Sequence, residues 1–256
     1  MSHSLPAAAT PLPASGQVHL WLATEPEQLD EAQQRRYAGW LDHDERVRWQ
    51  RFHIKADQQC YLFAHALVRS VLAGYLQQLP EQLRFTHNRY GKPELDHSLQ
   101  PRLHALRFNL SHTRGLIALA VTVDAEVGVD VEATSRKVEV QALADRFFAP
   151  SEASLLRETA PDLQRELFFR LWTLKEAYVK ARGLGLQLGL ESFAFSFDAQ
   201  EAPGMTTVES NVDATHWSFF QYQQPPHFRV AVAVQAAGLT DDALILRTTS
   251  FDTPIR

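Results

Sequence analysis

The sequence has few of the features that mark secreted, membrane or disulfide-rich proteins. Cys60 is the one cysteine among 256 residues, which excludes an intrachain disulfide. The longest uncharged apolar stretch, residues 115–123, is too short to span a bilayer. Residues 1–16 contain no lysine or arginine and so lack the positive region of a signal peptide. We therefore expect a disordered tail at 1–16 and a cytoplasmic protein with no membrane partner.

Several signatures of ligand-binding sites are also missing. The sequence has no metal-binding spacing of cysteine and histidine, no GxGxxG dinucleotide loop and no GxxxxGK[ST] phosphate loop. The aromatic residues are scattered rather than interleaved with basic ones, which does not favour binding of single-stranded nucleic acid. We expect no nucleic-acid partner.

The charge of the chain is unevenly distributed. The net charge is −5, but residues 35–114 hold 13 basic and 7 acidic side chains, a balance of +6. The remainder holds 12 basic and 23 acidic side chains, a balance of −11. A basic region beside an acidic one suits a ligand with several negative charges that is completed by a metal ion. The same split could arise from surface composition alone.

Hydrophobic periodicity predicts a mixed α and β organisation. Strands are predicted at 18–22, 84–86, 106–110, 115–123, 126–132, 193–197, 217–222 and 228–234. Helices are predicted at 26–40, 44–52, 56–76, 140–148, 151–158 (with Ser151 as its N-cap) and 162–182. Each half thus offers helices and about three strands, which predicts an α/β (α+β) fold. The halves could be similar, although no sequence repeat demonstrates a duplication.

Two carboxylates stand two residues apart in the predicted strand at 126–132. Because side chains alternate along a strand, Asp130 and Glu132 share one face and the neighbouring valines share the other. Such a pair can offer oxygens to one hard cation. Gly128, on the same face, would leave room for a ligand to approach the backbone. The alternative is a strand with one solvated face, which is the commoner meaning of an isolated D-x-E pattern.

Glu176 and Lys180 are four residues apart in the predicted helix at 162–182 and so lie on one helix face. Spacing alone favours a surface ion pair, which would stabilise the helix by about 0.3–0.5 kcal/mol. The segment is also rich in aromatic residues, namely Phe168, Phe169, Trp172 and Tyr178. These predict a helix packed on most sides, where a charged pair needs a partner such as a metal or an anion.

A polar cluster, Ser111, His112 and Thr113, follows the predicted strand at 106–110. Hydroxyls, backbone N–H groups and an imidazolium at a strand end can hold a phosphate. The turn at 90–93 and the arginines at 46, 48 and 51 would add positive charge if the fold brings them near. Ser111 and His112 are poorly placed as nucleophile and base of a hydrolase, because adjacent strand residues point to opposite faces. The alternative is that His112 is an ordinary turn residue.

Five segments occur in an order typical of one family. They are Gly91-Lys92-Pro93, residues 108–112, residues 127–132, Arg146-Phe147-Phe148 with Glu152, and residues 172–180. Over about residues 35–235 the chain resembles the 4′-phosphopantetheinyl transferases of the Sfp type. Each motif is weak alone, but five in register are highly specific.

The resemblance implies a pseudo-twofold monomer whose two similar subdomains, each a small sheet with packed helices, meet around coenzyme A and Mg²⁺. The expected parts are the tail at 1–16, an N-terminal subdomain at 17–124 on the phosphate and adenine side, and a C-terminal subdomain at 125–256 on the metal and catalytic side. The implied reaction moves the 4′-phosphopantetheine arm of coenzyme A onto a serine of an apo acyl or peptidyl carrier protein and releases 3′,5′-ADP. The carrier could serve fatty acid, polyketide or non-ribosomal peptide assembly.

The resemblance also implies roles for the acidic cluster. Asp130 and Glu176 correspond to metal ligands, with Glu132 as the third. Lys180 would contact the pyrophosphate and steady the leaving group. A carboxylate, Glu176 directly or through a metal-bound water, would take the serine proton, and which carboxylate does so is left open.

On the nucleotide side, the resemblance implies contacts from Ser111, His112, Lys92 and the backbone near Gly91 to the phosphates and adenine. Arg48 and Arg51 fall where the family has basic residues for the 3′-phosphate. The chain departs from the family at residues 58–60, Gln-Gln-Cys, where several members have a basic residue. Two alternatives are a non-catalytic coenzyme A or nucleotide-binding regulator of the same fold, and an unrelated α+β domain in which the motifs coincide.

Overall fold

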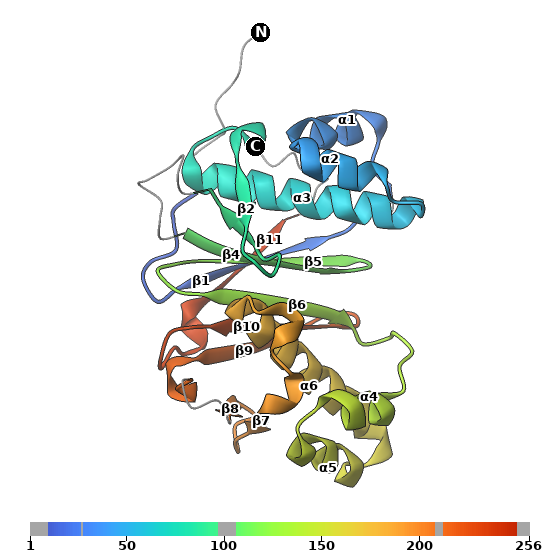
Figure 1. Cartoon of the computed structure of the whole chain (residues 1–256), viewed down its shortest axis with the longest axis vertical. Helices are drawn as coiled ribbons and strands as arrows, with labels where there is room; N and C mark the ends of the chain where they lie inside the picture. The colour runs from blue at the N-terminus through green and yellow to red at the C-terminus, as the bar shows by residue number, and fades with distance from the viewer. Residues whose placement is uncertain (1–9, 27, 97–105, 208–211, 250–256) are drawn as a thin grey trace.

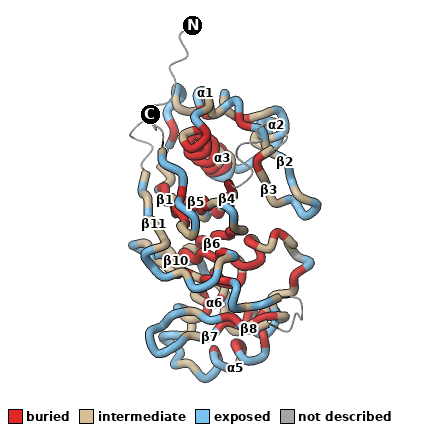
Figure 2. The backbone as a smooth tube through the Cα atoms, turned by 90° about the vertical axis from the view of Figure 1, so that its left-hand side faces the viewer, coloured by how far each residue is buried: buried red, intermediate tan, exposed pale blue. Residues whose placement is uncertain are grey.

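Two small sheets stacked face to face form the centre of the molecule, and a long helix covers the outer face of each sheet (Figure 1). The computed structural model describes residues 10–26, 28–96, 106–207 and 212–249. Figure 2 shows that burial is concentrated in α3, in α6 and in the central strands. This arrangement agrees with the predicted α+β fold of two halves, each with a sheet and packed helices.

The N-terminal helical layer contains α1 (Glu31–Trp40), α2 (His43–Gln50) and α3 (Lys55–Leu76). Both α1 and α2 begin at a capping box, in which the carboxylates of Asp30 and Asp42 accept from the backbone N–H three residues later. The cap at Asp30 explains why the first helix starts later than the predicted residue 26. Helix α3 is buried around most of its circumference because it lies between the sheet and the two shorter helices.

The N-terminal sheet contains β1 (Val18–Thr24), β4 (Leu106–Thr113), β5 (Leu116–Val123) and β11 (Leu244–Thr249), in the order β11-β1-β5-β4. Strand β1 is antiparallel to β5 and parallel to β11, which the sequence did not predict. Strand β4 continues through Thr113. The expectation that it ends at residue 110 was wrong, because Ser111 and His112 pair with β5.

The C-terminal sheet contains β6 (Val127–Ala133), β10 (Phe228–Val234) and β9 (Ser218–Gln224), in that order. Its helices are α4 (Val140–Phe147), α5 (Pro150–Glu158) and α6 (Pro161–Arg182). Helix α5 begins at Pro150 with Ala149 as N-cap, so the predicted cap at Ser151 was wrong. The carboxylate of Glu152 accepts from the Ala149 N–H instead, at 3.0 Å.

Two short ribbons complete the strands. They are β2 (Phe85–His87) with β3 (Pro93–Leu95), and β7 (Phe193–Phe197) with β8 (Pro203–Thr207). Single 3₁₀ turns lie at Pro80–Gln82, Gly185–Gln187, Leu190–Ser192, Ala214–His216 and Asp241–Ala243. The predicted strands and helices agree with the described elements to within a few residues, but β3, β8 and β11 were not predicted.

The core between the two sheets confirms the predicted alternation along β6. Its valines pack against apolar side chains of β1, β5, β9 and β10. The face that carries Asp130 meets α6 instead, because a Cβ at Gly128 would lie 2.1 Å from the carbonyl oxygen of Ala177 and 2.3 Å from the backbone nitrogen of Ala181. Gly128 therefore admits a helix backbone. The expectation that it leaves room for a ligand was wrong.

Strands β4 and β6 belong to different sheets but run side by side in the same direction. Side chains join them in place of a backbone ladder: Asn109 Oδ1 accepts from the Val129 N–H at 2.9 Å, and Ser111 Oγ accepts from the Val131 N–H at 3.2 Å. We call these four residues the β4–β6 seam. The two halves of the molecule therefore meet through polar side chains at this seam.

The ends of the chain depart from the expected division into parts. Residues 1–9 lie outside the described residues. Pro13 is buried, and Thr10 Oγ1 lies 3.1 Å from the Cβ position of Gly74 in α3, so the expected tail contacts the folded chain at these two residues. Strand β11 lies in the N-terminal sheet although residues 125–256 were expected to form one subdomain. Among the described residues, no helix is long and apolar enough to cross a membrane.

Candidate active site

The buried carboxylate of Asp130 lies at the centre of a polar cluster on β6, beside the seam. Its Oδ1 accepts from Ser111 Oγ at 3.0 Å and from Lys180 Nζ at 2.6 Å. Its Oδ2 is buried and has no hydrogen-bond partner among the described residues. Buried polar atoms in proteins are nearly always satisfied, so the orphaned Oδ2 marks a position for a cation or a donor from a ligand.

Glu132 and Glu176 lie close enough to Asp130 for their charges to repel. Burial raises the pKa of both carboxyls, and the Asp130 charge raises each further. No group of three His, Cys, Asp or Glu within the described parts of the chain has the geometry of a metal site. The chemistry of the three carboxylates nevertheless suits a hard, oxygen-preferring ion such as Mg²⁺, which would relieve their repulsion.

Lys180 joins α6 to this cluster. Two of the three protons on its ammonium go to Ser111 Oγ (2.8 Å) and Asp130 Oδ1 (2.6 Å), which leaves one for another acceptor. Its partner is therefore Asp130 on the neighbouring strand, whereas spacing alone favoured an ion pair with Glu176. Lys180 and Glu176 both line a cavity of about 310 Å³ together with Gly91.

Two further cavities adjoin the first one. A cavity of about 280 Å³ shares Gly91 with it and is also lined by Arg48, Tyr61 and His65. The same three side chains line the largest of the three cavities, of about 770 Å³, which also includes His112. Through these shared residues the three cavities adjoin one another from His112 past Arg48 to Lys180, and we call them together the trough.

The structure brings only some of the predicted phosphate contacts to the trough. His112 lines it, and its Nδ1 lies 3.4 Å from Cys60 Sγ. Burial and the charge of Lys180 lower the pKa of His112. Arg48 lines it with its guanidinium 5.8 Å from the centre of the Tyr61 ring. Arg51 is exposed beyond the end of α2 and is not among the residues lining the three cavities.

Lys92 lines the trough, but its ammonium is engaged elsewhere. It donates to Glu126 Oε2 at 2.8 Å, to the Ala181 carbonyl at 2.9 Å and to the Val127 carbonyl at 3.4 Å. These bonds use all three of its protons and tie the β2–β3 turn to β6 and α6. A contact from Lys92 to a phosphate would have to replace one of them, and this role stays a prediction.

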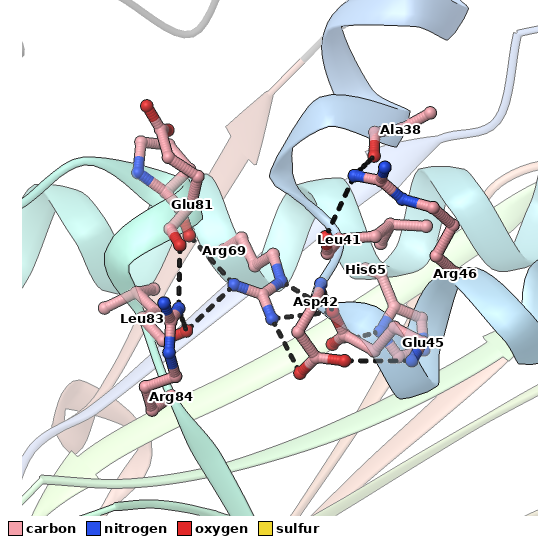
Figure 3. A network of polar contacts seen from close by, with 11 residues as sticks. Ala38, Leu41, Asp42, Glu45, Arg46, His65, Arg69, Glu81, Leu83 and Arg84 are labelled. Atoms are coloured by element: carbon pink, nitrogen blue, oxygen red, sulfur yellow. Dashed lines mark hydrogen bonds and ion pairs between the residues drawn. The ribbon is translucent and has the colours of Figure 1, made fainter.

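A network of charged side chains holds His65 at the wall of the trough (Figure 3). Arg69 is fully buried and donates to Glu45 Oε2 at 2.6 Å and to Asp42 Oδ2 at 3.2 Å. Burial alone would raise the pKa of Glu45, but the hydrogen bond with His65 and the charge of Arg69 outweigh it and lower this pKa to about 2. An ionised carboxylate can only accept, so His65 Nδ1 donates to Glu45 Oε1, at 2.9 Å.

His65 was not predicted from the sequence as a candidate residue. Its partner Glu45 is twenty positions away on a different helix, and no local pattern links the two. The one available signal was Arg69, a charged residue on the apolar stripe of the predicted helix at 56–76. Such a residue needs buried partners of opposite charge.

The segment that departs from the family, residues 58–60, also borders the trough. Gln59 and Cys60 line its largest cavity, while the Gln58 amide donates to the Trp49 carbonyl at 3.1 Å. Burial and the nearby Glu25 carboxylate raise the pKa of Cys60 to about 12. Cys60 is therefore a neutral thiol at neutral pH and a poor nucleophile.

Comparison with known proteins gives consistent matches over both halves. Residues 126–234 match the family model described as 4′-phosphopantetheinyl transferase superfamily, and residues 28–124 match that described as 4′-phosphopantetheinyl transferase, N-terminal. The chain is 34% identical over 224 residues to the 4′-phosphopantetheinyl transferase HetI of Nostoc sp., covering 88% of this chain and 90% of HetI. It is 28% identical over 214 residues to the 4′-phosphopantetheinyl transferase Sfp of Bacillus subtilis, covering 84% of this chain and 91% of Sfp.

A solved structure is similar to part of the chain. It is a holo-(acyl-carrier-protein) synthase from Bacillus anthracis in complex with CoA (3′,5′-ADP), with a TM-score of 0.35 and 18% identity. The match covers 44% of this chain and 96% of that chain.

Proposed function

The chain belongs to the 4′-phosphopantetheinyl transferase family, and on this premise we propose that it moves the phosphopantetheine arm of coenzyme A onto a serine of an apo acyl or peptidyl carrier protein. The reaction is Mg²⁺-dependent and releases 3′,5′-ADP. The observation that carries this proposal is the Asp130 carboxylate, with one oxygen held by Ser111 and Lys180 and the other buried without a partner among the described residues. The charges of Asp130, Glu132 and Glu176 act on one another, and Glu176 and Lys180 line one end of the trough.

Coenzyme A would lie along the trough. Its 3′-phosphate would occupy the end lined by Arg48, His65 and His112, whose N–H groups can donate to phosphate oxygens. Its pyrophosphate would reach Lys180, whose third ammonium proton is not used by Ser111 or Asp130. The backbone near Gly91 would border the adenine. The predicted contacts from Arg51 and Lys92 have weaker support, because Arg51 lies outside the three cavities and the protons of Lys92 are taken.

The chemical step exchanges one P–O bond for another. The serine oxygen of the carrier attacks the phosphorus that bears the pantetheine arm, and the bond from that phosphorus to the bridging oxygen breaks. The bridging oxygen leaves with the electron pair as part of 3′,5′-ADP, and Lys180 neutralises the charge that develops there. Glu176 takes the serine proton, a role that its raised pKa supports. Mg²⁺ held by Asp130, Glu132 and Glu176 would supply further neutralisation of the pyrophosphate charge.

Mass spectrometry of a carrier protein tests the function directly. Incubation with coenzyme A, Mg²⁺ and a panel of apo carriers should add one phosphopantetheine mass to a carrier serine. Asp130→Asn should abolish the addition, whereas Glu158→Gln, at an exposed carboxylate at the end of α5, should not. No mass gain on any carrier would contradict the proposal. The panel also identifies whether fatty acid, polyketide or non-ribosomal peptide carriers are served.

A non-catalytic coenzyme A-binding regulator of the same fold is the alternative function. Calorimetry that detects coenzyme A binding while no carrier gains mass would favour it. We further infer a cytoplasmic monomer without a nucleic-acid or membrane partner. The presence of both halves of the site in one chain supports a monomer, and sedimentation analysis tests the oligomeric state.

A further inference from the structure

We propose that Ser111 is a positioning residue, whose hydroxyl fixes Asp130 and Lys180 relative to one another and does not contact the phosphates of coenzyme A. The inference rests on the proposed function and refines it, since the family resemblance implied a phosphate contact at this position. Ser111 lies within β4, is 6% exposed and faces β6 across the seam.

The hydrogen-bonding capacity of the Ser111 hydroxyl is fully used. A hydroxyl has one proton to donate and two lone pairs to accept with. Ser111 donates to Asp130 Oδ1 at 3.0 Å and accepts from Lys180 Nζ at 2.8 Å and from the Val131 N–H at 3.2 Å. A bond to a phosphate would displace one of these partners and leave a buried group unsatisfied.

These bonds determine which oxygen of Asp130 is available. Oδ1 is held by two donors that come from two different elements, β4 and α6, so rotation of the carboxylate is restricted. Oδ2 is then the oxygen that remains for a cation or ligand. Without the Ser111 hydroxyl, Lys180 alone would hold Oδ1, and the carboxylate and the ammonium could turn together.

The seam contains its own matched control. Asn109, two residues before Ser111, makes the equivalent bond to β6: its Oδ1 accepts from the backbone N–H of Val129 at 2.9 Å. Asn109 is equally buried, at 5% exposed, but none of its described hydrogen bonds goes to Asp130 or Lys180. Removing its side chain therefore weakens the seam without removing a bond to the cluster.

Steady-state kinetics and binding distinguish positioning from phosphate contact. We expect Ser111→Ala to lower kcat about tenfold or more, the size of effect that a misplaced reactive group produces, while KM for coenzyme A stays within about threefold. The calorimetric Kd for coenzyme A in EDTA should likewise be nearly unchanged. Ser111→Thr, which keeps the hydroxyl, should recover most of kcat. Asn109 also borders the cavity that Lys180 lines, so Asn109→Ala should lower the melting temperature and should lower kcat clearly less than Ser111→Ala does.

Three outcomes would overturn the inference. If Ser111→Ala raises the Kd for coenzyme A about tenfold and keeps the kcat of the wild type, Ser111 contacts a phosphate. An equal loss of kcat in Asn109→Ala would assign the effect to the seam as a whole. Unchanged kcat and Kd would remove any role. If Ser111→Ala does not fold, Ser111→Cys, which keeps only a weak donor, replaces it in each comparison.

A metal titration keeps the inference testable apart from the transferase reaction. Mg²⁺ should raise the melting temperature of the wild type, because it binds the folded carboxylate cluster. The Mg²⁺ concentration at half of this rise should increase in Ser111→Ala and not in Asn109→Ala. A wild type that modifies no carrier contradicts the proposed function alone, and an equal half-rise concentration in all three proteins contradicts the positioning role.

Discussion

Replacing Lys175 by methionine should destabilise the C-terminal half strongly, because it leaves a buried carboxylate without its counter-ion. Lys175 Nζ lies 2.6 Å from Glu152 Oε2, and the two side chains are 0% and 1% exposed. The ammonium also donates to the carbonyls of Leu190 (2.8 Å) and Phe193 (2.6 Å), so it ties α6 to the segment that leads into β7. All three protons of the ammonium thus have acceptors within the protein.

The magnitude follows from removing one partner of a buried pair. Such a change costs about 3–5 kcal/mol, since an uncompensated buried charge remains. For a chain of this size that corresponds to a fall in melting temperature of about 6–20 °C. Burial raises the pKa of Glu152 and lowers that of Lys175, and the opposite charge of each partner counteracts this. Without the Lys175 charge, burial should raise the pKa of Glu152 further.

Urea unfolding of a double-mutant cycle measures the coupling. The variants are Lys175→Met, Glu152→Gln and the double variant. Arg157→Gln, at an exposed residue of the same helix as Glu152, is the surface control. We expect the loss of unfolding free energy in the double variant to be smaller than the sum of the two single losses by at least about 1 kcal/mol. A loss below about 1 kcal/mol for Lys175→Met, or strictly additive losses, would refute the reasoning.

Three other substitutions test the fold. Gly128→Ala should abolish cooperative thermal unfolding, since its Cβ would lie 2.1 Å from the Ala177 carbonyl oxygen, and a normal melting curve would contradict the packing described. Burial and the charge of a nearby arginine lower the pKa of His19 from 6.5 to about 4, so the folded state binds fewer protons than the unfolded state between these values. The free energy of unfolding should thus fall by about 3 kcal/mol as the pH falls through this window. Urea unfolding of His19→Gln should not show this fall. The same pH dependence in His19→Gln and the wild type would contradict the role given to His19. Arg69→Met should cost about 3–5 kcal/mol because Glu45 loses its buried partner, and Arg69→Lys should not restore it; a loss below about 1 kcal/mol would contradict the network.

The central elements were predictable because their local patterns agree with their tertiary surroundings. The alternating valines of β6 face the core between the sheets, and the apolar residues of α3 fill the layer above the first sheet. Two of the missed strands, β3 and β8, lack such a pattern. Strand β3 begins with Pro93 and β8 with Pro203, residues that sequence rules count against strands unless the strand is short or at an edge.

The candidate site was predictable residue by residue but not in its pairings. Asp130 and Lys180 lie on the faces that strand and helix periodicity assign to them. Their direct contact depends on the distance between β6 and α6, which Gly128 sets and which no local pattern encodes. The same holds for Lys92, whose bonds to Glu126 and to backbone carbonyls join segments far apart in sequence.

The parallel pairing of β11 with β1 has a consequence for synthesis on the ribosome. Strand β1 is made first, but its outer edge stays without a partner until residues 244–249 have been translated and have left the exit tunnel. During that interval the apolar strand, with Val18, Leu20 and Leu22, offers open backbone donors and acceptors to other chains. A stalled or shortened chain would therefore expose an association-prone edge in the half that was translated first, far from the point of truncation.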